Sequence, residues 1–263
     1  MALRTALWTV MTGAAQKAAR SMKRDFGEIE QLQVSQKGPS DFVSAADLKA
    51  EKVIRLELAK ARPRFGFLLE EGGEIAGEDG HHRWIIDPID GTTNFLHGIP
   101  HFAISIGLEM DGDIIAGLVF NPITDEMYYA EKGKGAFLND KRLRVSARTK
   151  LSDCVVATGI PFHGRPGHKP FLGQLERVMD AVAGVRRMGT ASLDLAYVAA
   201  GRYDGFWETG LQPWDMAAGV ILVREAGGFI TELNGGKNAL GSGNVLAANP
   251  KIHKHLFDLL ATG

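Results

Sequence analysis

Two aspartates, Asp87 and Asp90, close an apolar stretch in the segment WIIDPIDGTTNF, residues 84–95. Pro88 between them fixes its own φ and favours extended geometry for Asp87, so we predict that both acids lie in a turn at the end of a strand. Carboxylate oxygens are hard ligands that suit divalent cations. The spacing therefore predicts a cation site.

The residues that follow Asp90 predict an anion-binding site. Gly91 permits a tight backbone turn, and Thr92 and Thr93 are residue types that begin helices. The first N–H groups of a helix have no partner within it and can donate to a phosphate. We therefore predict a phosphate bridged to the protein by a metal ion. The same residues also fit an ordinary exposed turn, because Asp-Pro and Asp-Gly are common turn dipeptides.

Other acids fall where further predicted strands end or predicted helices begin. Glu70 and Glu208 each follow an apolar strand, and Asp215 lies in the first turn of a helix. Asp47 follows Ser44 by three residues, which is the capping-box pattern. Each acid alone has a structural explanation, either a helix cap or a solvated loop.

Together, Glu70, Asp87, Asp90 and Asp215 would repel one another unless a cation lay between them. None of the eight histidines has zinc-ligand spacing to another histidine or to Cys154, the single cysteine. An all-oxygen ligand set predicts Mg2+ before Mn2+ or Ca2+.

The elements that must position these acids alternate along the second half of the chain. Consecutive strands in the middle, at 101–109, 114–120, 127–130 and 135–138, predict an antiparallel meander. Later strands at 154–158, 186–188, 203–207, 229–231 and 245–248 alternate with helices at 170–182, 190–200 and 214–226 and a last helix after Pro250. We predict an α/β fold of two sheets layered with helices. The polar segment 36–41 is interpreted as a mobile loop.

The N-terminal segment admits two interpretations. Residues 2–24 contain five basic residues and no acid, a composition that resembles a transit peptide. Leu7, Met11, Ala14, Ala18 and Met22 nevertheless recur at helical spacing, as in a core-packing helix. We favour the core helix and hence a cytoplasmic protein.

Composition argues against several classes of protein. The 263 residues carry a net charge of −1, so no global field attracts nucleic acid or an acidic membrane. One cysteine excludes an intrachain disulfide framework, and the apolar surroundings of Cys154 predict a buried side chain. No apolar run approaches the roughly 20 residues that span a bilayer.

Residues 84–95, together with the segment WDMAAGVILVREAGG at 214–228, resemble the two signature motifs of the inositol monophosphatase family. The resemblance covers nearly the whole chain, and residues 189–202 resemble the bacterial extragenic suppressor branch in particular. It implies a five-layer αβαβα sandwich like that of fructose bisphosphatases, formed by one catalytic domain over 1–263 with sub-layers at about 1–150 and 151–263. It also implies a Mg2+-dependent, Li+-inhibited phosphatase that hydrolyses myo-inositol monophosphate and forms a homodimer.

The resemblance further assigns residues to roles. One Mg2+ would be held by Glu70, Asp87 and the carbonyl of Ile89, a second by Asp87, Asp90 and Asp215, and a weaker third near Glu70. Thr92 and Asp47 would orient the attacking water. Contacts to the substrate would come from Asp90, Gly91, Thr92, Thr93, Gly189, Thr190, Ala191, Glu208 and Asp215.

Specificity and partners stay open. Gln212 and the pair Ser44 and Ala46 depart from the pattern of many family members, and Gln212 lies beside the ring-binding segment. Another small phosphate monoester is therefore an alternative substrate. The bacterial branch is also associated with transcription and RNA processing, for which a basic cluster could supply a face: Lys141, Arg142, Arg144, Arg148 and Lys150.

Overall fold

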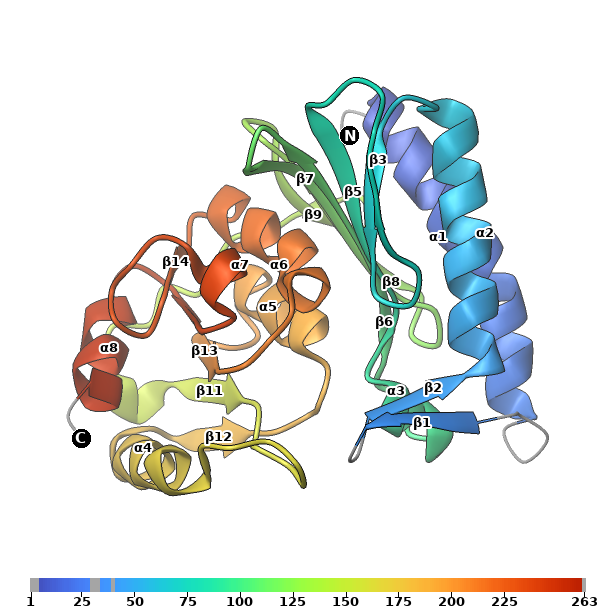
Figure 1. Ribbon diagram of the computed structural model, residues 1–263. Helices are drawn as coiled ribbons and strands as arrows, with labels where there is room; N and C mark the ends of the chain where they lie inside the picture. The colour runs from blue at the N-terminus through green and yellow to red at the C-terminus, as the bar shows by residue number, and fades with distance from the viewer. Residues whose placement is uncertain (1–4, 29–33, 39–40, 262–263) are drawn as a thin grey trace.

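The structure is a computed structural model that describes residues 5–28, 34–38 and 41–261. Helices and sheets alternate in five layers (Figure 1). The order is α1 (Ala6–Gly27) with α2 (Ala45–Ala61), an eight-stranded sheet, α5 (Ala191–Ala199) with α6 (Pro213–Glu225), a five-stranded sheet, and α4 (His168–Ala181) with α8 (His253–Ala261). The predicted αβαβα sandwich is confirmed.

The eight-stranded sheet contains the predicted meander. Its strand order is β10 (Lys141–Arg142), β9 (Gly135–Leu138), β8 (Glu126–Glu131), β7 (Asp113–Asn121), β6 (Ala103–Met110), β5 (His82–Asp90), β3 (Gly66–Leu69) and β4 (Gly73–Ile75). Among the described strands of this sheet, only β3 and β5 pair in parallel, with Leu69 opposite Ile86. The residues that follow, Glu70 and Asp87, therefore reach the same edge of the sheet.

The five-stranded sheet has the order β12 (Gly184–Arg186), β11 (Val155–Thr158), β13 (Gly205–Glu208), β15 (Val245–Ala248) and β14 (Phe229–Thr231). Strand β11 runs parallel to both β12 and β13. Cys154 directly precedes β11 and is buried, as predicted. Three short helices complete the part of the chain that the structure describes: α3 (Thr92–Leu96), a 3-10 turn (Leu151–Asp153) and α7 (Ala239–Ser242).

The N-terminal helix is confirmed as a core helix. Met11, Ala14, Ala18 and Met22 are buried on one face of α1, against the eight-stranded sheet and α2. None of the helices in the described part of the chain is long and apolar enough to cross a membrane.

The prediction of a mobile loop at 36–41 was wrong. Backbone pairing joins β1 (Val34–Gly38) to β2 (Asp41–Ser44) as an antiparallel pair, and residues 39–40 lie outside the described residues. A polar sequence does not reveal that its backbone groups will find ladder partners, because strand formation depends on context more than on intrinsic propensity.

Two glycines let α6 lie unusually close to the large sheet. Gly107 of β6 and Gly117 of β7 are paired directly across the ladder. A Cβ on Gly107 would lie 2.7 Å from the Cβ of Ala217, and one on Gly117 would lie 2.7 Å from the carbonyl oxygen of Ala218. The helix that carries Asp215 therefore packs directly against the backbone of the large sheet, and close packing fixes its position.

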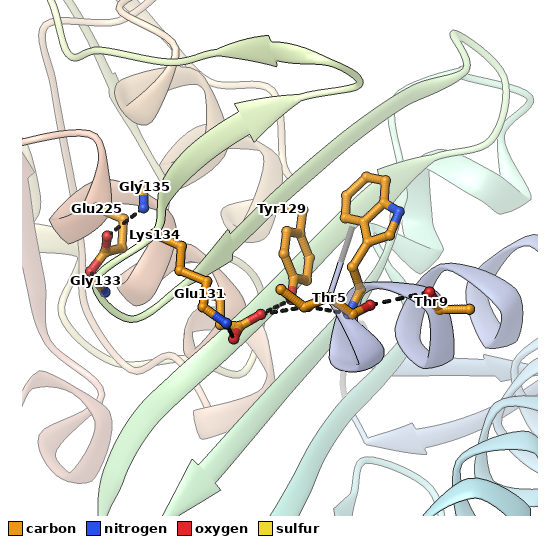
Figure 2. A network of polar contacts seen from close by, with 9 residues as sticks. Thr5, Thr9, Tyr129, Glu131, Gly133, Lys134, Gly135 and Glu225 are labelled. Atoms are coloured by element: carbon orange, nitrogen blue, oxygen red, sulfur yellow. Dashed lines mark hydrogen bonds and ion pairs between the residues drawn. The ribbon is translucent and has the colours of Figure 1, made fainter. Parts of the chain in front are cut away.

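A polar network ties three layers together at the far end of this helix (Figure 2). Thr5, which caps α1, donates from its hydroxyl to Glu131 at 2.6 Å, and the Tyr129 hydroxyl donates to the same carboxylate at 2.9 Å. Glu225 of α6 accepts the backbone N–H groups of Gly133 and Gly135, both at 2.8 Å. The outer helix, the β8–β9 turn and α6 are thereby held in fixed relation.

Candidate active site

A pocket of about 380 Å3 lies where the ends of β3, β5 and β13 meet the N-termini of α3, α5 and α6. Most of the residues predicted from the sequence line it: Glu70, Asp87, Ile89, Asp90, Gly91, Thr92, Thr93, Gly189, Ala191, Glu208 and Asp215. The other two predicted residues, Asp47 and Thr190, are buried directly behind this lining and hydrogen-bonded to it or beside it.

The predicted turn at Asp87 and Asp90 is in fact a β-bulge. Strand β5 continues to Asp90, with Asp87 opposite Ser105 and Asp90 opposite Ala103, so β5 has one residue more than β6 between these pairs. Pro88 lies in the bulge, where a residue without an N–H is tolerated. The extra residue bends the strand, so that both acids line the pocket.

Backbone N–H groups orient the carboxylates. Asp87 Oδ1 accepts from the N–H of Ile89 at 2.9 Å, and Asp90 Oδ2 accepts from the N–H of Ser192, at the start of α5, at 2.7 Å. A carboxylate offers two oxygens, so the side chains that accept these bonds can also contact a ligand.

Asp215 is held in the same way. Its Oδ2 accepts from the N–H of Gln212 at 2.8 Å, and the two residues form a capping box at the start of α6. Pro213 occupies the first turn, where its missing N–H costs nothing. Gln212, one of the departures from the family pattern, thus has a structural role through its backbone.

Burial and mutual repulsion raise the pKa values of carboxyl groups in the pocket. Burial, then the charges of Glu70 and Asp90, raise the pKa of Asp87 well above its ordinary value. Burial raises the pKa of Asp90 to about 6, although its bonds to Ser192 oppose the rise. Burial and the charges of Asp215 and Asp90 raise the pKa of Glu208 to about 8.

This donor set fits a divalent cation, because a cation would relieve the repulsion among clustered carboxylates that otherwise take up protons. Within residues 5–28, 34–38 and 41–261, however, no three His, Cys, Asp or Glu side chains already stand in position to coordinate one ion.

Thr92 and Asp47 come together across 45 residues of sequence. The Thr92 hydroxyl lies 3.3 Å from Asp47 Oδ1 and 3.0 Å from the carbonyl oxygen of Ile89. Asp47 also completes the predicted capping box, since its Oδ2 accepts from the N–H and hydroxyl of Ser44. One oxygen therefore caps α2 while the other faces the site.

Gly91 is required by the geometry at the start of α3. Its φ is +92°, in the left-handed region, and a Cβ there would lie 2.5 Å from Thr190 Oγ1. The segment around Thr190 is further tied to α3 by Asn94, whose side-chain amide donates to the carbonyl of Met188 at 2.8 Å. The predicted phosphate and ring segments are therefore adjacent.

The pocket is also lined by residues that the sequence did not predict: Gly159, Phe162, Arg165 and Arg187. Arg165 lies over the Phe162 ring, 4.5 Å from its centroid, and donates to the carbonyl of Gly210 at 3.0 Å. These residues are in segments next to strand ends, and their types and spacing do not differ from those of ordinary loop residues. Only the parallel pairing of β11 with its neighbours places them here.

Comparison with known proteins decides the family. A sequence profile described as the inositol monophosphatase family matches residues 4–262. The chain belongs to the inositol monophosphatase family. It is 61% identical over 257 residues to a protein of Rhizobium meliloti named inositol-1-monophosphatase, with 98% of this chain and 97% of that protein covered.

Other members of the inositol monophosphatase family carry a second name. The chain is 43% identical to the Escherichia coli K12 protein named Nus factor SuhB, over 92% of this chain and 90% of that one. The crystal structure of the extragenic suppressor protein suhB from Bartonella henselae superposes with a TM-score of 0.96 at 59% identity, covering 98% of this chain and all of that chain.

Proposed function

We propose that this protein hydrolyses myo-inositol monophosphate to inositol and phosphate with the help of Mg2+. The observation that carries the proposal is the convergence of Glu70, Asp87, Asp90 and Asp215 on one pocket beside the N-terminus of α3. Two to three ions would be held by Glu70, Asp87, Asp90, Asp215 and the carbonyl of Ile89. Bound Mg2+ lowers the pKa of a water molecule and neutralises charge on the leaving oxygen.

The residues of the chain would position the reactants. Thr92 lies close enough to Asp47 to donate its proton there, which leaves the hydroxyl oxygen to accept a hydrogen bond from the attacking water and orient it. Backbone N–H groups of Gly91 and Thr92 would bind the phosphate. Thr93 lies beside them, and the remaining contacts to the ring would come from Gly189, Thr190, Ala191 and Glu208.

Phosphate release from inositol 1-phosphate tests the proposal. We expect turnover with Mg2+, its loss after chelation, and recovery when Mg2+ is restored. Asp90→Asn should lower kcat by at least about 100-fold, because it removes a charged ligand from the metal site. Asp180→Asn, on the exposed face of α4, is the control and should be unaffected. Metal-independent turnover or full activity of Asp90→Asn would refute the proposal.

Several properties extend the same proposal. We expect inhibition by Li+, a homodimer, a cytoplasmic location and one catalytic domain over residues 1–263. The close relatives named inositol-1-monophosphatase support inositol phosphate over other small phosphate monoesters. Comparison of kcat/KM for inositol 1-phosphate, histidinol phosphate and a sugar bisphosphate decides among these substrates.

A role with RNA or the transcription machinery is a second candidate, favoured by the relatives named Nus factor. The five basic residues at 141–150 are exposed, although Arg148 pairs with Asp204 at 3.2 Å and Arg142 lies over the Phe137 ring. Salt-sensitive binding to structured RNA, weakened by Lys141→Ala but retained in Asp90→Asn, would support this role. Lack of binding at low salt would argue against it.

A further inference from the structure

The Glu208 carboxyl fills the space beside Gly159. Strands β11 and β13 are parallel with Thr158 opposite Trp207, so Gly159 and Glu208 are the next residues along the two neighbouring chains. A Cβ on Gly159 would lie 1.9 Å from Glu208 Cδ and 2.0 and 2.2 Å from the two carboxyl oxygens. The carboxyl group therefore occupies the volume that any side chain at position 159 would need.

A loop bounds this region of the pocket. The hydrogen bond from Arg165 to the Gly210 carbonyl joins the segment after β11 to the segment after β13, and within the first segment Arg165 lies over the Phe162 ring. Phe162, Arg165, Gly159 and Glu208 line both the main pocket and an adjoining pocket of about 320 Å3. The carboxyl is thus bordered by the backbone of Gly159 on one side and approached by the loop on another.

We propose that Gly159 is a positioning residue for Glu208 and that it determines how well the pocket recognises a polyol ring. The proposal rests on the function proposed above. Without a side chain at position 159, the carboxyl can lie at the end of β11 and accept hydrogen bonds from ring hydroxyl groups. An alanine at this position would displace the carboxyl toward the pocket or the loop.

Gly159→Ala tests the proposal, because the backbone of Gly159 is outside the left-handed region, so the clash of the added Cβ with Glu208 is the change that the variant makes. We expect KM for inositol 1-phosphate to rise about tenfold, as for loss of one hydrogen bond to the substrate, with kcat within about twofold. Both constants for p-nitrophenyl phosphate, which has no ring hydroxyls, should stay within about twofold. Gly13→Ala, exposed on α1 with no atom within 4 Å of the added Cβ, is the matched control.

A double-mutant cycle separates positioning from general damage. In a Glu208→Ala background the added methyl has no carboxyl to displace, so Gly159→Ala should change KM by less than about twofold. An unchanged KM in the single variant, an equal effect in both backgrounds, or an equal loss on both substrates would overturn the inference. A wild-type protein that hydrolyses p-nitrophenyl phosphate but not inositol 1-phosphate would refute the proposed function, and the inference with it.

Discussion

At the scale of single residues, some acidic side chains of the site both cap a helix and face the pocket or a residue that lines it. Asp47 caps α2 with one oxygen and faces Thr92 with the other, and Asp215 caps α6 while lining the pocket. A cap fixes a carboxylate within hydrogen-bonding distance of backbone, so its remaining oxygen points in a defined direction. A capping pattern in the sequence therefore does not argue against a functional acid.

The hydroxyl of Thr92 gives a prediction at this scale. Thr92→Val keeps the shape of the side chain and removes the group that would orient the water, so kcat should fall by about 100- to 10,000-fold with KM little changed. Thr92→Ser keeps the hydroxyl and is expected to retain most of the activity. Equal kcat values for the valine and serine variants, measured by phosphate release, would exclude this role.

At the scale of elements, glycines decide how closely helices approach their neighbours. Gly107 and Gly117 seat α6 on the large sheet, and Gly219 of α6 would place a Cβ 2.4 Å from Leu195 of α5. Close packing of this kind leaves little freedom for the helix to shift. The N-terminus of α6, and with it Asp215, is therefore positioned by contacts along the whole helix.

Gly117→Ala tests that packing. The added Cβ would meet the backbone oxygen of Ala218 at 2.7 Å and its Cα at 2.8 Å, and backbone cannot move aside as a side chain can. We expect the free energy of unfolding to fall by about 1–3 kcal/mol in urea titrations, with a loss of kcat/KM. Gly13→Ala, at an exposed helical position, should raise stability slightly. A transition midpoint like that of the wild type would show that α6 is not held in this way.

At the scale of the whole molecule, the acids of the pocket link stability to pH and to metal. Their pKa values are raised in the folded state, to about 6 for Asp90 and about 8 for Glu208, from ordinary values of 3.8 and 4.5. The folded protein then binds more protons than the unfolded protein between these values, so these groups lower the free energy of unfolding as pH rises through this range.

Urea unfolding as a function of pH checks this linkage. With chelator present, the contribution of these acids to the free energy of unfolding should decline between pH of about 4 and about 8. The decline should be shallower for Asp90→Asn than for the Asp180→Asn control. Mg2+ should raise the unfolding midpoint most at the upper end of the range, because it binds the ionised carboxylates of the folded state. Equal stabilisation by Mg2+ of the wild type and of Asp90→Asn would contradict a metal site at these acids.

The sequence by itself determined the local features. Apolar spacing identified α1, the meander and the last strands, and Ser44 with Asp47 predicted the cap of α2. It also selected the acids at element ends, since strand and helix boundaries have local signals in residue type. The metal ligands and substrate contacts assigned by family resemblance stay predictions, although their residues lie together.

Only the tertiary structure decided what depends on pairing between distant segments. The bulge at Asp87–Asp90 is defined by the register against β6, the pair β1–β2 by its backbone partners, and the contact of Gly159 with Glu208 by the parallel alignment of β11 with β13. The register of paired strands and the close approach of their residues are set by the packing of whole elements. Residue type alone does not specify which strand will lie beside another.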